Sequence, residues 1–127
     1  MTQDRNTGAR ANEFGKRMAI IVATHIGAKK VNSDGNEFIW QDKKVTIRSA
    51  HKGNAYVGVL YSMLERVDAV LGALETDKPD EFQIWELDSR AYRARSKPQV
   101  KNPLIAQLPT KVFAKEGKLT AKVMDSK

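Results

Sequence analysis

The sequence predicts an α/β domain in which two main helices flank a mixed β-sheet of at least four strands. Apolar residues recur at helical spacing over 11–26 and again over 57–75, which is typical of amphipathic helices. Between these segments, 37–41 and 44–50 alternate as a pair of strands, and 81–87 is rich in aromatic and β-branched residues. Helices interspersed with strands indicate an α/β fold.

Size and composition favour one intracellular domain. A chain of 127 residues can bury a core without cross-links, and the absence of Cys excludes disulfides and thiolate metal sites. The two His residues are too few for a multi-histidine metal site, although carboxylates can hold Mg²⁺. The longest apolar run, 18–23, is too short to cross a membrane, and 1–10 is polar rather than signal-like. We therefore expect a soluble, cytoplasmic protein without membrane contact.

The charge of the chain points to a polyanionic partner. The formal net charge is +7, and beyond residue 96 seven Lys stand against only Glu116 and Asp125. Such an uneven excess favours nucleic acid as the partner, with DNA first. The alternative is that the lysines only keep the surface hydrated.

The N-terminal third is expected to contain an arm, a helix and a short strand. Apart from Met1 and Ala9, residues 1–10 lack apolar side chains, and they are predicted to form a flexible arm. The helix over 11–26 ends at Gly27, a residue suited to a C-terminal cap, and His25 is expected on its core face. A short strand over 28–31 and a turn rich in Asn, Asp and Gly follow.

The central part is expected to form a hairpin followed by a long helix. Strands 37–41 and 44–50 are predicted to pair through a turn at 42–43. A polar loop over 51–54 comes next, and Asn54 suits the N-cap of the helix predicted over 57–75.

The last third begins with a strand over 81–87 and a short cationic helix over 90–95, capped by Asp88 or Ser89. Residues 11–95 are therefore taken as the core domain. Three Pro residues weaken the pattern beyond this point, and short strands are predicted at 112–113 and 119–123. Residues 96–127 are expected to be a basic, extended segment packed on or near the core.

The order of these elements resembles the PD-(D/E)xK, or restriction-endonuclease-like, superfamily. No P-loop, dinucleotide-binding glycine pattern, Gly-x-Ser-x-Gly elbow or zincin helix is present. The resemblance covers about 11–87 and implies an α-β-β-β-α-β core. It also implies a Mg²⁺-dependent DNA endonuclease whose metal is held by acids on the first helix and the central strands.

Carried over to this chain, the resemblance assigns Glu13 as the acid of the first helix and Asp34 or Glu37 as the acid of the following strand. Glu13, Asp34 and Glu37 are thus the candidate Mg²⁺ ligands, and their alternative role is that of ordinary surface acids. The acidic-x-Lys triplet falls on 46–48, where Thr46 replaces the acid and Arg48 replaces the Lys. Arg holds a phosphate well but does not readily lose a proton.

Two further groups of cations are predicted to hold phosphate. Arg48, His51, Lys52 and Asn54 surround the polar loop, where His51 is also a candidate base because its charge changes near neutral pH. The candidate catalytic residues are therefore Glu13, Glu37, Arg48 and His51. The second group consists of Arg90, Arg93, Arg95 and Lys97, with Tyr92 between them able to stack on a base. The candidate nucleic-acid contacts are Lys43, Lys44, Arg48, Lys52, Arg90, Arg93 and Arg95. Trp40 and Trp85 are expected to fill the core, and their alternative role is to stack on bases.

The preferred interpretation is a DNA-binding, restriction-endonuclease-like domain with Mg²⁺-dependent phosphodiester cleavage as its activity. The alternatives are a non-catalytic nucleic-acid-binding module with the same fold, and a protein-interaction subunit with a basic tail. A homodimer is expected, formed through the outer side of the helix over 57–75 or through the C-terminal segment, because small DNA-binding domains commonly read two-fold sites as pairs.

Overall fold

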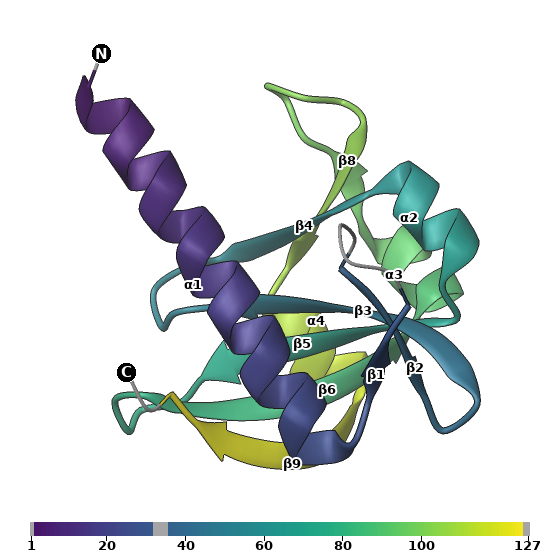
Figure 1. Ribbon diagram of the computed structural model, residues 1–127. Helices are drawn as coiled ribbons and strands as arrows, with labels where there is room; N and C mark the ends of the chain where they lie inside the picture. The colour runs from purple at the N-terminus through teal and green to yellow at the C-terminus, as the bar shows by residue number, and fades with distance from the viewer. Residues whose placement is uncertain (1, 32–35, 126–127) are drawn as a thin grey trace.

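The computed structural model describes residues 2–31 and 36–125, with side chains from Glu13 onward. This part of the chain forms three layers (Figure 1). Helix α1 crosses one face of a six-stranded sheet, and a three-stranded sheet with three short helices covers the other face. The elements are α1 (Thr2–Ile26), β1 (Lys29–Lys30), β2 (Glu37–Trp40), β3 (Lys43–Ala50), β4 (Tyr56–Leu60), α2 (Tyr61–Arg66), β5 (Ala69–Glu75), β6 (Glu81–Asp88), α3 (Ser89–Arg95), β7 (Lys97–Pro98), β8 (Ile105–Pro109), α4 (Lys111–Glu116) and β9 (Lys118–Met124).

Helix α1 confirms the first predicted helix and its cap. Met18 and Val22 are fully buried against the sheet, and Gly27 adopts a positive φ of 78°. The amide of Ala28 then donates to the carbonyl of Ala23 at 2.8 Å, which is the Schellman arrangement that closes a helix end. Two expectations are corrected: the helix begins at Thr2, so the predicted arm is helical from there, and His25 is exposed rather than in the core.

The main sheet has the order β1-β2-β3-β5-β6-β9, in which only β3 and β5 are parallel neighbours. The predicted hairpin is confirmed as β2 and β3. Its turn lies one residue earlier than expected, because Gln41 and Asp42 take the positive φ values of 51° and 61° that a two-residue type I′ turn requires. Lys43 is therefore the first residue of β3 rather than part of the hairpin turn, and Lys44 lies in the strand as predicted.

The helix predicted over 57–75 is wrong. Residues 57–75 span most of β4, all of α2 and all of β5. Asn54 therefore caps no helix, because strand β4 follows it. In β4, Val57 and Val59 are buried and alternate with more exposed residues. In β5, the run from Ala69 to Ala73 is buried on both faces. A run that is apolar throughout satisfies a helical and a strand period equally, and here pairing with β3 and β6 decides the outcome.

The second face of the sheet is packed by residues from the C-terminal segment. Phe113 is fully buried, and its ring meets Tyr92 edge-on with centroids 6.3 Å apart. A Cβ on Gly72 would lie 2.7 Å from that ring, so glycine is needed where Phe113 crosses β5. The strand predicted at 112–113 is thus wrong, because these residues belong to α4. Residues 97–124 are built into the fold, and β9 is an edge strand of the main sheet.

Three predictions in the last third of the chain are confirmed in outline. Strand β6 matches the predicted strand, and β9 matches the short strand expected over 119–123. Helix α3 begins where expected, and the Asp88 carboxylate accepts a hydrogen bond from the Arg90 amide at 2.8 Å as an N-cap. No helix in the described part of the chain combines the length and apolar character needed to cross a membrane.

Candidate functional site

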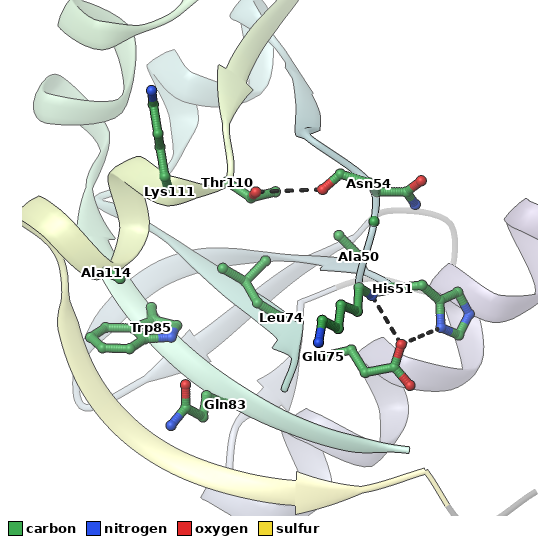
Figure 2. A pocket seen from close by; sticks show the side chains of 12 residues that line it. Ala50, His51, Asn54, Leu74, Glu75, Gln83, Trp85, Thr110, Lys111 and Ala114 are labelled. Atoms are coloured by element: carbon green, nitrogen blue, oxygen red, sulfur yellow. Dashed lines mark hydrogen bonds and ion pairs between the residues drawn. The ribbon is translucent and has the colours of Figure 1, made fainter. Parts of the chain in front are cut away.

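A pocket lies where the parallel strands β3 and β5 end, and its volume is about 290 Å³. Its walls come from the β3–β4 loop, from the end of β5, from β6 and from the start of α4 (Figure 2). Ala50, Leu74, Gln83 and Trp85 project from the strands into this pocket. The carboxyl ends of parallel strands are where open α/β sheets place ligands. This is the end of the sheet that the sequence singles out through the polar loop over 51–54.

The start of α4 is tied to the β3–β4 loop on the far side of the pocket. The amide of Thr110 donates to the carbonyl of Ala55 at 2.8 Å, and its hydroxyl lies 3.4 Å from the carbonyls of Asn54 and Ala55. These bonds hold the loop and α4 together above the strands. The side chain of Lys111, the next residue, extends away from the strands in Figure 2 and is exposed.

His51 and Glu75 form a fixed pair at one edge of the pocket. One Glu75 oxygen accepts from the Lys52 amide at 2.9 Å and lies 3.3 Å from His51 Nδ1, while the other accepts from the Asp80 amide at 2.9 Å. The His51 ring stacks on Phe14 of α1 with centroids 4.0 Å apart. Figure 2 shows the imidazole directed away from Trp85, so His51 does not face the pocket floor.

These contacts lower the pKa of Glu75. The largest cause is the hydrogen bond from the Asp80 amide, followed by the one from the Lys52 amide, and His51 adds to them. The carboxylate is thus stabilised in its charged form at the junction of the β3–β4 loop and the β5–β6 connection.

We expect Glu75→Gln to lower stability at neutral pH and to flatten its acid dependence. Because the folded pKa is depressed, the contribution is present above the ordinary value of 4.5 and is lost as the pH falls through the folded pKa. Urea denaturation at a series of pH values measures this. Glu65→Gln is the control, since Glu65 is exposed and receives no backbone hydrogen bond from a described residue. Parallel pH profiles for wild type and Glu75→Gln would contradict the assignment.

The candidate metal ligands do not come together. Glu13 is an exposed residue of α1, which packs on the first face of the sheet. Glu37 is 7% exposed, and its carboxylate accepts a hydrogen bond from Arg66 Nε at 3.2 Å. Because Arg66 belongs to α2, this contact places the Glu37 side chain on the second face of the sheet. Asp34 lies outside the described residues. Within the described part of the chain, no three His, Asp or Glu side chains gather as a metal ion would need.

Arg48 shares a face with Thr46 and Glu37 but does not reach the pocket. On β3 it lies opposite Gly72 of β5 and points to the second face of the sheet. Its Nε is buried there without a hydrogen-bond partner among the described residues. Burial lowers the pKa of Arg48, and the nearby Tyr92 opposes that shift. Tyr92 is fully buried, and its hydroxyl donates to the Ala106 carbonyl at 2.9 Å, so it cannot stack on a base as predicted.

We expect Arg48→Met to leave the free energy of unfolding unchanged or raise it by about 1 kcal/mol, because an unpaired guanidinium is costly to enclose. Chemical denaturation measures this, with Arg48→Lys as the variant that keeps a cation. If Arg48 instead held phosphate, Arg48→Met would weaken binding to nucleic acid. We expect that binding to change by less than about two-fold.

Most of the predicted nucleic-acid contacts are engaged within the protein. Lys43 pairs with Glu86, Lys52 with Asp77, Arg93 with Glu65 and Arg95 with Glu116, whereas Lys44 and Arg90 are exposed without an acidic side-chain partner among the described residues. Lys43 also lies beside a second cavity lined by Asp68, Glu86, Asp88 and Glu116, so that end of the sheet carries mixed charge. Exposed pairs of this kind are weak and can exchange for phosphate.

Four further unpaired cations come from the C-terminal segment, in which only Lys97 was assigned to a predicted cationic group. Lys97, Lys101, Lys111 and Lys115 are exposed, and none of them makes an ion pair with a described residue. Their signal was visible in the sequence as the basic excess beyond residue 96. The Pro residues around them obscured the elements that carry them.

Comparison of the chain with models of protein families, with curated proteins and with solved structures gives no match. The function is therefore argued from the geometry and charge of the chain itself.

Proposed function

We propose that the protein is a non-catalytic nucleic-acid-binding module that holds DNA through its acid-free C-terminal segment and the adjoining pocket. From Ser96 to Lys115 the chain contains no Asp or Glu. This segment carries β7, β8 and the start of α4, and its four lysines are exposed and unpaired among the described residues. That observation carries the proposal, because unpaired cations without neighbouring acids release counterions when they meet phosphates.

The pocket adjoins this segment directly. Strand β8 ends at Pro109, and Thr110 and Lys111 both line the pocket. A strand of nucleic acid that follows the lysines of α4 would thus pass the opening between α4 and the β3–β4 loop. Lys52 on that loop is 61% exposed, and Asp77, its partner, is 93% exposed, so the pair costs little to exchange for a phosphate.

The non-catalytic part of the proposal is supported by the donor set. Glu13 belongs to α1, on the first face of the sheet, whereas the Glu37 side chain points from β2 to the second face and is already bonded to Arg66. Thr46 stands where the acidic-x-Lys triplet of the PD-(D/E)xK superfamily has its acid. Its hydroxyl donates a hydrogen bond to the Asn36 carbonyl at 2.6 Å. These residues do not supply the converging carboxylates that a Mg²⁺-dependent nuclease requires.

A restriction-endonuclease-like arrangement remains part of the proposal. It is supported by the order of the first elements, in which a helix precedes three antiparallel strands and β3 then pairs in parallel with β5. The crossover between β3 and β5 contains strand β4 as well as α2, which differs from the single helix of the expected pattern.

Binding is tested by fluorescence anisotropy with a labelled DNA duplex over a range of KCl concentrations. If the four lysines each engage a phosphate, log K should fall with log salt with a slope of about −3.6. A slope near zero, or no binding at low salt, would reject the proposal and favour the protein-interaction alternative.

Cleavage is tested separately with supercoiled plasmid in Mg²⁺ or Mn²⁺. We expect no nicking above the buffer control at protein concentrations that bind the plasmid. Nicking that disappears in Glu13→Gln or Glu37→Gln would overturn the non-catalytic assignment and restore the nuclease.

The homodimer stays a prediction. One surface expected to form it was the outer side of a helix over 57–75, which does not exist, so the C-terminal segment is the remaining candidate. Light scattering on the protein alone and with DNA tests it, and a monomer in both states would reject it.

A further inference from the structure

We infer that the pocket at the ends of β3 and β5 receives one unpaired nucleobase, stacked on Trp85. The inference rests on the proposed function, and it identifies which part of a bound nucleic acid enters the protein. Four features of the pocket support it: an accessible aromatic ring, an amide side chain without a hydrogen bond to a described residue, a carboxylate already engaged by backbone amides, and a suitable volume.

The aromatic ring belongs to Trp85, which β6 turns toward the pocket. Phe82 and Ile84 point into the core beneath α1, so Gln83 and Trp85 point to the other face. The pairing of β6 with β9 shifts register between Ile84 and Trp85, an irregularity that redirects a side chain. Trp85 is only partly buried, in contrast to Trp40, which is 8% exposed. Figure 2 shows the indole lying low in the pocket between β6 and α4.

The free amide belongs to Gln83, beside Trp85 in Figure 2. Gln83 lines the pocket, and its side chain makes no hydrogen bond with any described residue. A carboxamide offers two donors and one acceptor, which matches the mixed edge of a nucleobase. Single-stranded nucleic acids are commonly recognised by this combination of an aromatic platform and hydrogen bonds to an unpaired base edge.

The charges around the pocket favour a neutral group inside and phosphate outside. Glu75 is the one acid that lines the pocket, and amides of Lys52 and Asp80 occupy its two oxygens. Figure 2 shows that its carboxylate is directed toward His51 rather than toward Trp85. The cations Lys52 and Lys111 lie on opposite walls, on the β3–β4 loop and on α4. A base in the pocket would leave its flanking phosphates outside it, beside the two walls that carry these lysines.

The volume agrees with a single base. At about 290 Å³ the pocket lies near the lower limit of sites that hold small ligands. A planar base on Trp85 fits this size.

The test compares three ligands that share one duplex: a blunt duplex, the same duplex with a short adenine overhang, and the same overhang made abasic. The abasic overhang keeps the phosphates and removes the bases. We expect the adenine overhang to raise affinity on the order of 10-fold over the blunt duplex, and the abasic overhang to give little of that gain. We also expect the adenine overhang to quench the fluorescence of wild type but not of Trp85→Phe, in which Trp40 is the remaining tryptophan.

Variants separate the base contact from folding and from phosphate binding. Trp85→Ala and Gln83→Leu should each reduce the ratio of adenine-overhang affinity to that variant's own blunt-duplex affinity, and circular dichroism verifies that they fold. Tyr56→Ala, which removes an exposed aromatic ring outside the pocket, should retain the full gain.

The outcomes distinguish this inference from the proposed function. Blunt-duplex binding with equal affinity for adenine and abasic overhangs would overturn the base pocket and leave the module intact. If the wild-type protein bound none of the three ligands, the proposed function itself would be rejected. Adenosine monophosphate is tested alone, and affinity equal to that of the adenine overhang would overturn the assignment to a strand in favour of a free nucleotide.

Discussion

Replacing Phe113 by alanine is expected to lower the free energy of unfolding by about 3–5 kcal/mol. The Phe113 ring is fully buried and occupies the space that Gly72 leaves open on β5. Alanine would leave a cavity between β5 and α4 that the surrounding strands cannot close, because β5 is held on both sides by β3 and β6. Whole domains are stable by only about 5–15 kcal/mol, so this one change removes a large share. Urea denaturation followed by circular dichroism measures it.

The control for this variant comes from the same C-terminal segment. Leu104 is 70% exposed, and Leu104→Ala should change stability by less than about 0.5 kcal/mol. If residues 97–124 were only a tail lying on the core, the two variants would have similar, small effects. A loss below about 1 kcal/mol for Phe113→Ala would contradict the position of α4.

Reversing the charge of the acid-free segment is expected to have the largest effect on binding. The variant with Lys97, Lys101, Lys111 and Lys115 replaced by Glu should bind a DNA duplex at least about 100-fold more weakly at low salt. The slope of log K against log salt should also become shallower, by the amount expected for the loss of about four phosphate contacts. The physical reason is that each lysine is exposed and without an ion pair to a described residue, so each is available to a phosphate. Anisotropy titrations at several salt concentrations measure both quantities.

A matched variant separates a local interface from bulk charge. Lys16, Lys29, Lys30 and Lys78 are also exposed and unpaired among the described residues, but they lie on α1, on β1 and before β6. Replacing these four by Glu changes the net charge by the same eight units from +7. We expect it to weaken binding by less than about 10-fold. Equal losses in both variants would mean that net charge alone attracts DNA and that the C-terminal segment is not the interface.

The parts of the fold that the sequence predicted correctly are those decided by local chemistry. Gly27 takes the left-handed conformation that ends α1, and Asp88 caps α3 with its own carboxylate. The β2–β3 hairpin follows from alternating side chains on either side of a short turn. In each case the decisive contacts lie within a few residues of one another, so the pattern of the sequence contains them.

The predicted site was only partly correct for a related reason. The sequence drew attention to the loop over 51–54, and that loop does line the pocket. Identifying Trp85 as part of the same pocket required the pairing of β6 with β5 and β9, and the position of α4 above it. The predicted cluster of Glu13 with Glu37 assumed that both lie on one side of the sheet, and strand order places them on opposite faces.

By itself, the sequence determined the α/β class, the first helix, the hairpin, β6 and α3, and the concentration of lysines beyond residue 96. Only the tertiary structure decided that 69–75 is a central strand, that 111–116 is a helix over Gly72, and that Trp85 remains accessible. Apolar runs such as 69–74 carry no period that separates helix from strand. Their conformation is decided by hydrogen bonds to partners distant in the chain, here β3 on one side and β6 on the other.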